Sequence, residues 1–250
     1  MDTLIIAAGY GSRLSGSFKS KPLASINGVA LIEIAIRQAL KAGSTGIVVV
    51  TGHEAQALEH ALSSMSARLD VSIRCVRLAD WSRPNGYSVV AGAEIIEGDY
   101  LLVMADHILS VPILSGLLRS GSNDRGVTLA IDRAVTGQRV DPDDATWVKL
   151  DHSKRITAIG KHLSDYDAVD CGAFLATNEL SDAIQSAIAS GAAGSLSDGM
   201  QVLADKGRAA AFDIGNAWWI DVDDPPAHRL AETQAPQHLG DIFADSGVPV

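Results

Sequence analysis

The most constraining feature of the sequence is a short apolar run that leads directly into a glycine-rich, cationic loop. Residues 4–8, LIIAA, are followed by a turn, which is typical of a central strand in a parallel sheet. Gly9 and Gly11 allow backbone N–H groups to approach an anion closely, because neither carries a side chain. Three cations follow in the same loop: Arg13, Lys19 and Lys21. The segment therefore predicts a binding site for a nucleoside triphosphate.

Beyond this loop, apolar runs alternate with helical patterns, which is typical of a doubly wound α/β sheet. Strands are expected at 46–51, 71–78, 100–105, 127–131, 147–150, 155–159, 168–175, 209–214 and in the aromatic segment from Trp218. Helices are expected at 31–41, 53–66, 85–96, 178–190 and 196–204. At 250 residues the chain fits a single domain, and its weakly periodic tail, 233–250, is expected to be peripheral.

Composition excludes several classes of protein. A formal charge of −10 argues against nucleic acid as a partner, since such a protein would need a basic stripe. The sequence is 47% apolar but has no uninterrupted apolar run near 18 residues and no basic leader, so we expect a cytoplasmic protein with no membrane insertion. Cys75 and Cys171 form no disulfide or zinc motif, and we expect both thiols to be buried. The oligomeric state stays open, a homodimer included.

Two common glycine motifs do not fit the first loop. A Walker A loop requires GxxxxGK[ST], and a dinucleotide fingerprint requires a third glycine where Leu14 stands. The pattern that remains is AAGYGSRL at 7–14, with KPL beginning seven positions after Leu14. It resembles the signature of the sugar-phosphate nucleotidyltransferases of the MobA-like NTP transferase group. The resemblance implies a Rossmann-like α/β fold with a mixed sheet, a nucleotide-binding half at 1–120 and an acceptor-binding half at 121–232.

The resemblance also implies which residues contact the nucleotide. On the first loop these are Ala7, Ala8, Gly9 and Gly11. Gly52 follows the strand 46–51, at the sheet edge where open α/β sheets bind ligands, whereas the next residue, His53, is also consistent with a solvent-facing helix start. The segment NGYS supplies Asn85, Gly86 and Ser88, a variant associated with cytidylyltransferases. A plain turn and helix start would explain the same three residues.

Two aspartates are candidate ligands for Mg²⁺. Asp106 ends the strand 100–105 on the edge that faces the first loop, and a carboxylate there can hold magnesium against a triphosphate, although it could also cap the following turn. The segment WWIDVDDP resembles a stretch that, in this family, brings a second metal-binding aspartate to the site. The resemblance implies that Asp223 is this second ligand. Asp221 is either a ligand or a supporting group, and a helix N-cap would also explain Asp223 and Asp224.

The acceptor side is expected to use Lys161, Asp170 and Asp132. Lys161 follows the strand 155–159 and would neutralise the acceptor phosphate, although it could equally be a surface lysine. Asp170 enters a buried strand, where an unpartnered carboxylate is costly, so it is expected to bind acceptor hydroxyls or pair with a cation. Asp132 ends the strand 127–131. The acidic segment 140–146 either orders a metal or a polyol or is a solvated turn.

Further motifs narrow the resemblance. VMADHI, DCGAF and WWIDVDDP look like the CTP-dependent inositol-1-phosphate cytidylyltransferases, which release pyrophosphate as CMP is transferred. This implies Arg13 at the departing β- and γ-phosphates and Lys21 at the α-phosphate. Phosphocholine and 2-aminoethylphosphonate cytidylyltransferases, or another sugar-1-phosphate nucleotidylyltransferase, are the alternatives. Two alternatives belong to other functional classes. One is a nicotinamide-dependent oxidoreductase, which the missing third glycine disfavours, and the other is a catalytically silent nucleotide sensor.

Overall fold

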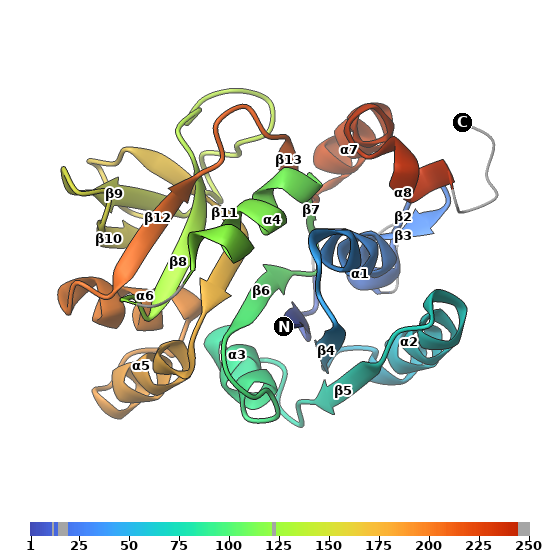
Figure 1. Ribbon diagram of the computed structural model, residues 1–250, viewed down its shortest axis with the longest axis horizontal. Coiled ribbons are helices and arrows are strands. Elements are labelled where there is room, and N and C mark those ends of the chain that lie inside the picture. The colour runs from blue at the N-terminus through green and yellow to red at the C-terminus, as the bar shows by residue number, and fades with distance from the viewer. Residues whose placement is uncertain (12, 15–19, 122–123, 245–250) are drawn as a thin grey trace.

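A computed structural model describes residues 1–11, 13–14, 20–121 and 124–244 (Figure 1). Within them a nine-stranded mixed sheet has the order β10–β9–β11–β6–β1–β4–β5, with β8 against β11 and β12 against β8. The strands are β1 (Asp2–Ala7), β4 (Gly46–Thr51), β5 (Ile73–Arg77), β6 (Tyr100–Met104), β8 (Val127–Asp132), β9 (Trp147–Leu150), β10 (Ile156–Gly160), β11 (Ala168–Ala176) and β12 (Ala209–Asp213). β6, β1, β4 and β5 run parallel, and β11 runs antiparallel to β6.

Helices cover both faces of the sheet, which explains why its central strands are continuously apolar. Alternate residues of β1 point to opposite faces, so that Leu4 and Ile6 belong to one buried cluster while Ile5 and Ala7 belong to another. On the first face lie α3 (Gly86–Ala93), α5 (Asn178–Ala189) and α6 (Leu196–Asp205). On the second lie α1 (Leu31–Ala42), α2 (Ala55–Leu69) and α4 (Val111–Ser120). The predicted doubly wound mixed sheet is confirmed.

A two-stranded ribbon outside the main sheet joins distant parts of the chain. β7 (His107–Leu109) pairs antiparallel with β13 (Trp219–Asp221), with Asp221 opposite His107. We expected the strand near Trp218 but neither β7 nor α4. Because β7 follows β6 after only two residues, the ribbon carries the segment around Asp221 to the carboxyl end of the central strands.

Two further elements support the first loop. A short 3₁₀ helix, η1 (Lys21–Leu23), is followed by the hairpin of β2 (Ser25–Ile26) and β3 (Val29–Ala30). At its turn Asn27 and Gly28 have φ of 47° and 83°, values that favour asparagine and glycine and that suit a tight hairpin.

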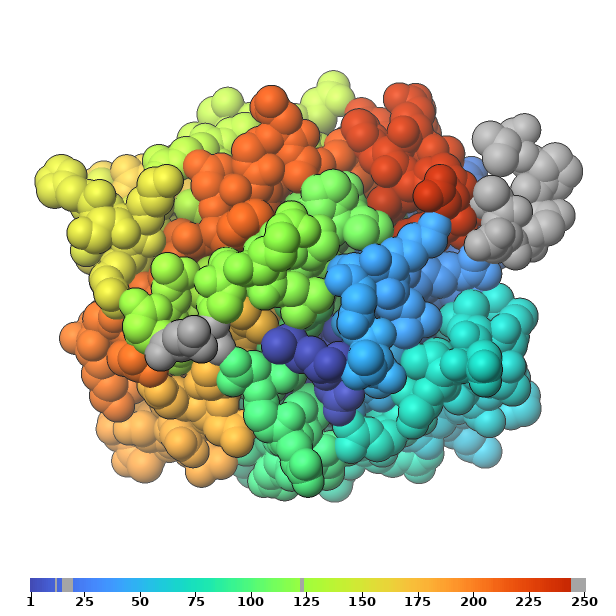
Figure 2. All heavy atoms as spheres, viewed as in Figure 1, coloured from blue at the N-terminus to red at the C-terminus, as the bar shows by residue number. Residues whose placement is uncertain are grey.

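The C-terminal segment is not peripheral, contrary to our expectation for 233–250 as far as the structure describes it. Helices α7 (Pro225–His238) and α8 (Gly240–Ala244) bury Ala235, Leu239 and Ile242 in a third apolar cluster. That cluster includes Leu14 of the first loop, which is 1% exposed. Figure 2 shows the red C-terminal helices lying against the blue N-terminal segments. Leu14 is therefore packed against the C-terminal helices.

The cysteines differ in exposure. Cys171 is buried as expected, but Cys75 is exposed because it lies on β5, which ends the parallel side of the sheet. None of the helices in the described ranges is long and apolar enough to cross a bilayer.

Candidate active site

Two cavities open at the carboxyl end of the central strands and share one boundary. The smaller, of about 350 Å³, is lined by Ala7, Ala8, Gly9, Gly11, Arg13, Lys21, Asn85, Ser88, Asp106 and Asp223 among others. The larger, of about 720 Å³, lies on the side of β10 and β11 and includes Lys161 and Asp170. Both are lined by Arg13, Asn85, Met104, Asp106 and Asp223. Most of the residues predicted from sequence therefore line one of the two cavities, and four of them, Arg13, Asn85, Asp106 and Asp223, lie at the shared boundary.

The first loop brings Lys21 into the smaller cavity. Gly11 has φ +62°, and a Cβ built there would lie 2.7 Å from the Cβ of Lys21, so a side chain is excluded both by conformation and by contact. Nothing lies within 4 Å of a Cβ built on Gly9, which keeps the neighbouring backbone open. Lys21 is only 7% exposed. Lys19 lies outside the described residues.

Two of the predicted nucleotide-binding glycines have packing roles and do not line either cavity in the described chain. A Cβ on Gly52 would lie 2.5 Å from the Cβ of Trp81 and 2.7 Å from the carbonyl oxygen of Ala8, so Gly52 lets these loops approach each other. A Cβ on Gly86 would lie 2.3 Å from the carbonyl oxygen of Gly194. Ser88 is buried at the cavity.

Asn85 joins the two cavities. Its Oδ1 accepts a hydrogen bond of 2.8 Å from the backbone N–H of Leu196, at the start of α6. The side chain does not cap α3, although Asn85 is the residue before that helix. Asn85, which lines both cavities, is therefore tied to the start of α6 beside the larger one.

An aromatic group that we did not predict flanks the smaller cavity. The His53 ring lies 4.6 Å from the Tyr10 ring and 5.0 Å from the Trp81 ring, edge to face in both cases. His53 thus contacts the first loop and is not simply a solvent-facing helix start. The three residues are separated in sequence by 28 residues or more, 81 − 53, so only the fold brings them together.

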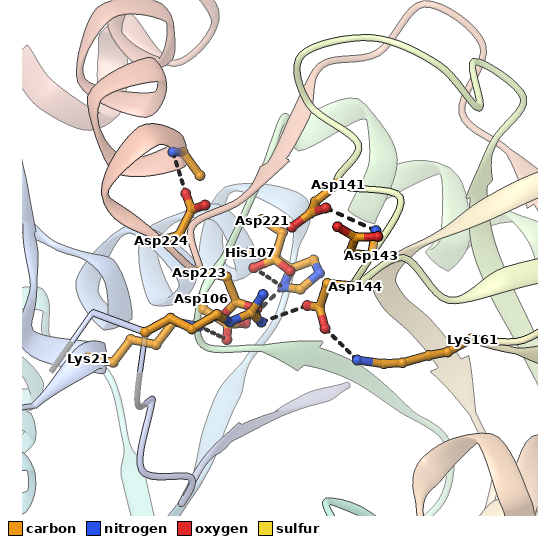
Figure 3. Close-up of polar contacts among 12 residues, drawn as sticks. Lys21, Asp106, His107, Asp141, Asp143, Asp144, Lys161, Asp221, Asp223 and Asp224 are labelled. Atoms are coloured by element: carbon orange, nitrogen blue, oxygen red, sulfur yellow. Dashed lines mark hydrogen bonds and ion pairs between the residues drawn. The ribbon is translucent and has the colours of Figure 1, made fainter.

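The boundary of the cavities holds alternating charges (Figure 3). The Lys21 ammonium donates to Asp106 Oδ2 at 2.5 Å and forms an ion pair with Asp223, which also pairs with Arg13. Burial opposes ionisation of Asp106, but Lys21 and a hydrogen bond from His107 outweigh it and hold the pKa of Asp106 well below its usual range. Asp106 is therefore ionised, as a ligand for a cation must be.

His107 and Asp221 complete this cluster. His107 Nδ1 lies 2.8 Å from Asp106 Oδ1, and it must be the donor because an ionised carboxylate only accepts. Burial alone would lower the pKa of His107, but the charges of Asp221 and Asp106 raise it to about 9. Burial raises the pKa of Asp221, whose buried Oδ1 has no hydrogen-bond partner in the described residues.

The donor set fits a hard divalent cation. Single carboxylate oxygens of Asp144, Asp221 and Asp223 lie within 4.8 Å of one another. One oxygen each of Asp106 and Asp221 lies within the same distance of a His107 ring nitrogen, but the protonated His107 supports these carboxylates and is not itself a ligand. Carboxylate oxygens are the ligands that Mg²⁺ prefers, and Oδ1 of Asp221, which accepts no hydrogen bond from the described residues and lies 3.7 Å from His107 Nδ1, is an acceptor available to such an ion. Asp224 instead caps α7 by accepting from the N–H of Ala227, as Figure 3 shows, so the N-cap alternative holds for it.

The acidic segment 140–146 is not simply a solvated turn. Asp144 Oδ2 accepts a hydrogen bond of 2.7 Å from Arg13, and its Oδ1 accepts one from Lys161. One carboxylate therefore bridges Arg13 of the first loop and Lys161 after β10. Nothing in the sequence separates Asp144 from Asp141 and Asp143, which precede it on the same turn.

Asp170 lies deeper in the larger cavity. Its Oδ1 accepts a hydrogen bond of 2.7 Å from the N–H of Gly172. Burial raises the pKa of Asp170 to about 6, while the Gly172 bond and the charge of His107 oppose the shift.

Asp132 is not placed as we expected. It is 3% exposed and lies behind the cavity wall, where Oδ1 accepts from Ala134 N–H and Oδ2 accepts from Trp219 Nε1, each at 2.8 Å. Both oxygens of this residue, the last of β8, are engaged by protein donors. Asp132 therefore supports the site without lining either cavity in the described chain.

Comparison with known proteins agrees with this geometry. The model of the MobA-like NTP transferase domain matches residues 3–140, more than half of the chain. On this match, the chain belongs to the MobA-like NTP transferase family.

Individual relatives are similar over most of the chain. A bifunctional IPC transferase and DIPP synthase from Rubrobacter xylanophilus is 34% identical over 230 residues, which cover 91% of this chain and 50% of that protein. Its namesake from Aquifex aeolicus is 25% identical over 96% of this chain and 54% of that protein. The chain thus spans about half the length of these curated relatives.

Solved structures share the fold. The inositol-1-phosphate CTP transferase from T. maritima superposes with a TM-score of 0.80 at 21% identity, covering 100% of this chain and 98% of that one. A putative glucose-1-phosphate thymidylyltransferase from Bacillus anthracis has a TM-score of 0.82 at 17% identity, covering 98% and 99%.

Proposed function

We propose that this chain is a Mg²⁺-dependent cytidylyltransferase that transfers CMP from CTP to inositol-1-phosphate, giving CDP-inositol and pyrophosphate. The observation that carries the proposal is the pair of cavities that meet at Arg13, Asp106 and Asp223. A donor nucleotide and an acceptor phosphate would need such a shared boundary to react. The T. maritima structure and the bifunctional relatives direct the choice of CTP and inositol-1-phosphate.

The smaller cavity would hold CTP. In this proposal the backbone of Ala7, Ala8, Gly9 and Gly11 contacts the nucleotide, and Asn85 and Ser88 lie beside the base and ribose. Gly52 and Gly86 contribute by allowing the surrounding loops to pack closely. Arg13 would stabilise the departing β- and γ-phosphates.

The reaction would be an in-line attack by an oxygen of the acceptor phosphate on the α-phosphorus, with pyrophosphate leaving. The attacking phosphate is already anionic near neutral pH, so no general base is required. Asp106 and Asp223 would hold Mg²⁺, which when bound would neutralise charge on the triphosphate. Lys21, buried between the same two carboxylates, would stabilise the negative charge that develops around the α-phosphate.

The larger cavity would hold the acceptor. Lys161 would bind the phosphate of the acceptor. Its ammonium donates to Asp144, which also contacts Arg13 at the shared boundary (Figure 3). Asp170 and Asp141 line the same cavity and would accept hydrogen bonds from ring hydroxyls. Asp132 would act indirectly through Trp219.

The test is a grid of pyrophosphate-release assays with Mg²⁺ or with EDTA. CTP, UTP, GTP and ATP are each combined with inositol-1-phosphate, phosphocholine, 2-aminoethylphosphonate and glucose-1-phosphate. We expect turnover only with CTP, inositol-1-phosphate and Mg²⁺. Asp106→Asn keeps the size of the side chain but removes its charge, and it should abolish turnover without unfolding the protein.

The other outcomes identify the alternatives. Turnover with CTP and an amine-bearing acceptor would keep the chemistry and replace the acceptor. Turnover with UTP and glucose-1-phosphate would indicate a sugar nucleotidylyltransferase. Folded protein that binds CTP but releases no pyrophosphate with any acceptor would contradict the proposal and favour a nucleotide sensor.

A further inference from the structure

Behind the cluster of carboxylates lies a buried aromatic contact that the proposed reaction does not use directly. The rings of Trp219 and His107 are stacked, with centroids 6.0 Å apart and planes inclined by 13°. Trp219 is 3% exposed and its Nε1–H donates to Asp132 Oδ2 at 2.8 Å. The hydrogen bond fixes the edge of the indole, so its face toward His107 is also fixed.

Backbone also approaches the imidazole closely. Gly172 has φ +73°, and a Cβ built on it would lie 2.4 Å from Cδ2 of His107. This glycine falls where the pairing of β11 with β8 changes register, between Asp170 and Phe174. The irregularity in β11 therefore lets the strand pass close against the His107 ring.

The orientation of this ring determines what Asp106 presents to the cavity. His107 Nδ1 donates to Asp106 Oδ1, while Asp106 Oδ2 accepts from Lys21. A rotated imidazole would release Oδ1, and the carboxylate could then turn. Groups that orient a metal ligand contribute to metal affinity even though they do not touch the ion.

We propose that Trp219 is a positioning residue for the metal site: held by Asp132, its indole fixes His107, which in turn fixes the carboxylate of Asp106. This inference rests on the proposed function, because it assumes a divalent cation at Asp106. It assigns the buried Asp132 a role in cation affinity through two intervening side chains.

The chain supplies a matched control in the adjacent residue. Trp218 is 6% exposed, but it points away from His107: its Nε1 donates to Gln234 and its ring stacks on His238 at 4.9 Å. Trp218→Leu and Trp219→Leu thus make the same chemical change at similar burial, at the residue just before β13 and at its first residue, with the two side chains in different surroundings. Only the second should change the metal site.

Metal binding is measured with Mn²⁺ alone, by the electron paramagnetic resonance signal of the free ion, on full-length protein whose folding is checked by circular dichroism. Trp219→Leu should raise the dissociation constant for Mn²⁺ by about tenfold or more. Trp218→Leu should leave it unchanged. In turnover assays, Trp219→Leu should raise the Mg²⁺ concentration for half-maximal rate and leave the KM for CTP unchanged at saturating Mg²⁺.

Trp219→Phe keeps an aromatic ring to stack on His107 but removes the Nε1–H and part of the indole surface, so we expect a smaller loss of Mn²⁺ affinity than in Trp219→Leu. If Trp219→Leu does not fold, this variant decides, and wild-type affinity in it would overturn the proposal. Equal losses in the Trp218 and Trp219 leucine variants would also overturn it, because the effect would then be general destabilisation. Wild-type protein that transfers CMP but binds no Mn²⁺ would refute the metal site and this inference while leaving the transfer reaction intact.

Discussion

Removing the negative charge of Asp144, whose carboxylate bridges two cations, should change substrate binding. The direction of that change distinguishes two roles for this residue. It forms ion pairs with Arg13 and Lys161, the two cations that would bind the phosphates of CTP and of the acceptor. If the phosphates compete with Asp144 for these cations, removing its charge should strengthen substrate binding. If Asp144 instead contacts acceptor hydroxyls, the same change should weaken binding.

The magnitude follows from the exposure of the pairs. The side chains of Arg13 and Lys161 are 43% and 52% exposed, and partly exposed ion pairs contribute about 0.2–1 kcal/mol each. Releasing both pairs in Asp144→Asn should therefore favour phosphate binding by about 0.4–2 kcal/mol in total, since the two effects add. About 1.4 kcal/mol corresponds to a tenfold change in affinity. The KM for CTP and the KM for inositol-1-phosphate should therefore both fall, and the two fold-decreases multiplied together should be about 2- to 30-fold.

Initial rates with CTP and inositol-1-phosphate varied in turn would give both KM values. Asp143→Asn is the control, because it removes one negative charge from the same turn and its carboxylate has no ion-pair partner in the described residues. A rise in the KM for inositol-1-phosphate in Asp144→Asn would refute competition and assign Asp144 to acceptor binding. An equal fall in Asp143→Asn would refute the specific pairs and indicate a general field effect.

Three further predictions follow from buried or constrained groups. Lys21→Ala should lower kcat by about 10²–10³-fold, because it removes a preorganised positive charge. It should change the affinity for CTP, measured by calorimetry, much less. Equal losses of kcat and of CTP affinity would indicate that Lys21 contributes only to ground-state binding. The pKa of Asp170 rises from 3.8 to about 6 on folding. Between these two pH values the native state binds more protons than the unfolded state, so the free energy of unfolding falls as the pH increases through this range. Asp170→Asn should therefore gain roughly 1–3 kcal/mol of unfolding free energy at pH 7 and nothing below about pH 4, measured by urea unfolding in EDTA; a gain independent of pH would contradict the assignment. Gly11→Ala should lose at least about 1–2 kcal/mol of unfolding free energy from its φ alone, whereas Gly9→Ala, with no close neighbour, should lose less; similar losses would show that the Gly11 conformation is not constrained.

The sequence predicts those parts of the fold that depend on local patterns. The run at 4–8 indicates a strand buried on both faces, and the structure divides its residues between two clusters. The helix α7 was not predicted as such because Pro225, Pro226 and Pro236 interrupt its pattern. Two of these prolines lie in the first turn, where the missing N–H costs nothing, so proline there is compatible with a helix.

Candidate site residues that directly follow a strand can be predicted from the sequence, whereas those on long loops are much harder to predict. Asp106 directly follows the predicted strand 100–105, so its position at the sheet edge could be inferred. Asp144 lies on a turn among similar acidic residues, and its contact with Arg13 joins positions 131 residues apart. No local pattern encodes such a contact, because it depends on how the 133–146 segment crosses the sheet.

The ribbon of β7 and β13 shows why composition alone could not locate the site. Its register places Asp221 opposite His107 and turns Trp219 toward His107, leaving Trp218 toward Gln234. A slip of one residue would exchange the two faces, bringing Ile220 to the carboxylates and turning Asp221 and Trp219 away. WWIDVDDP therefore specifies the site only in combination with the pairing of β7, and the arrangement of metal ligands is a property of this long-range register.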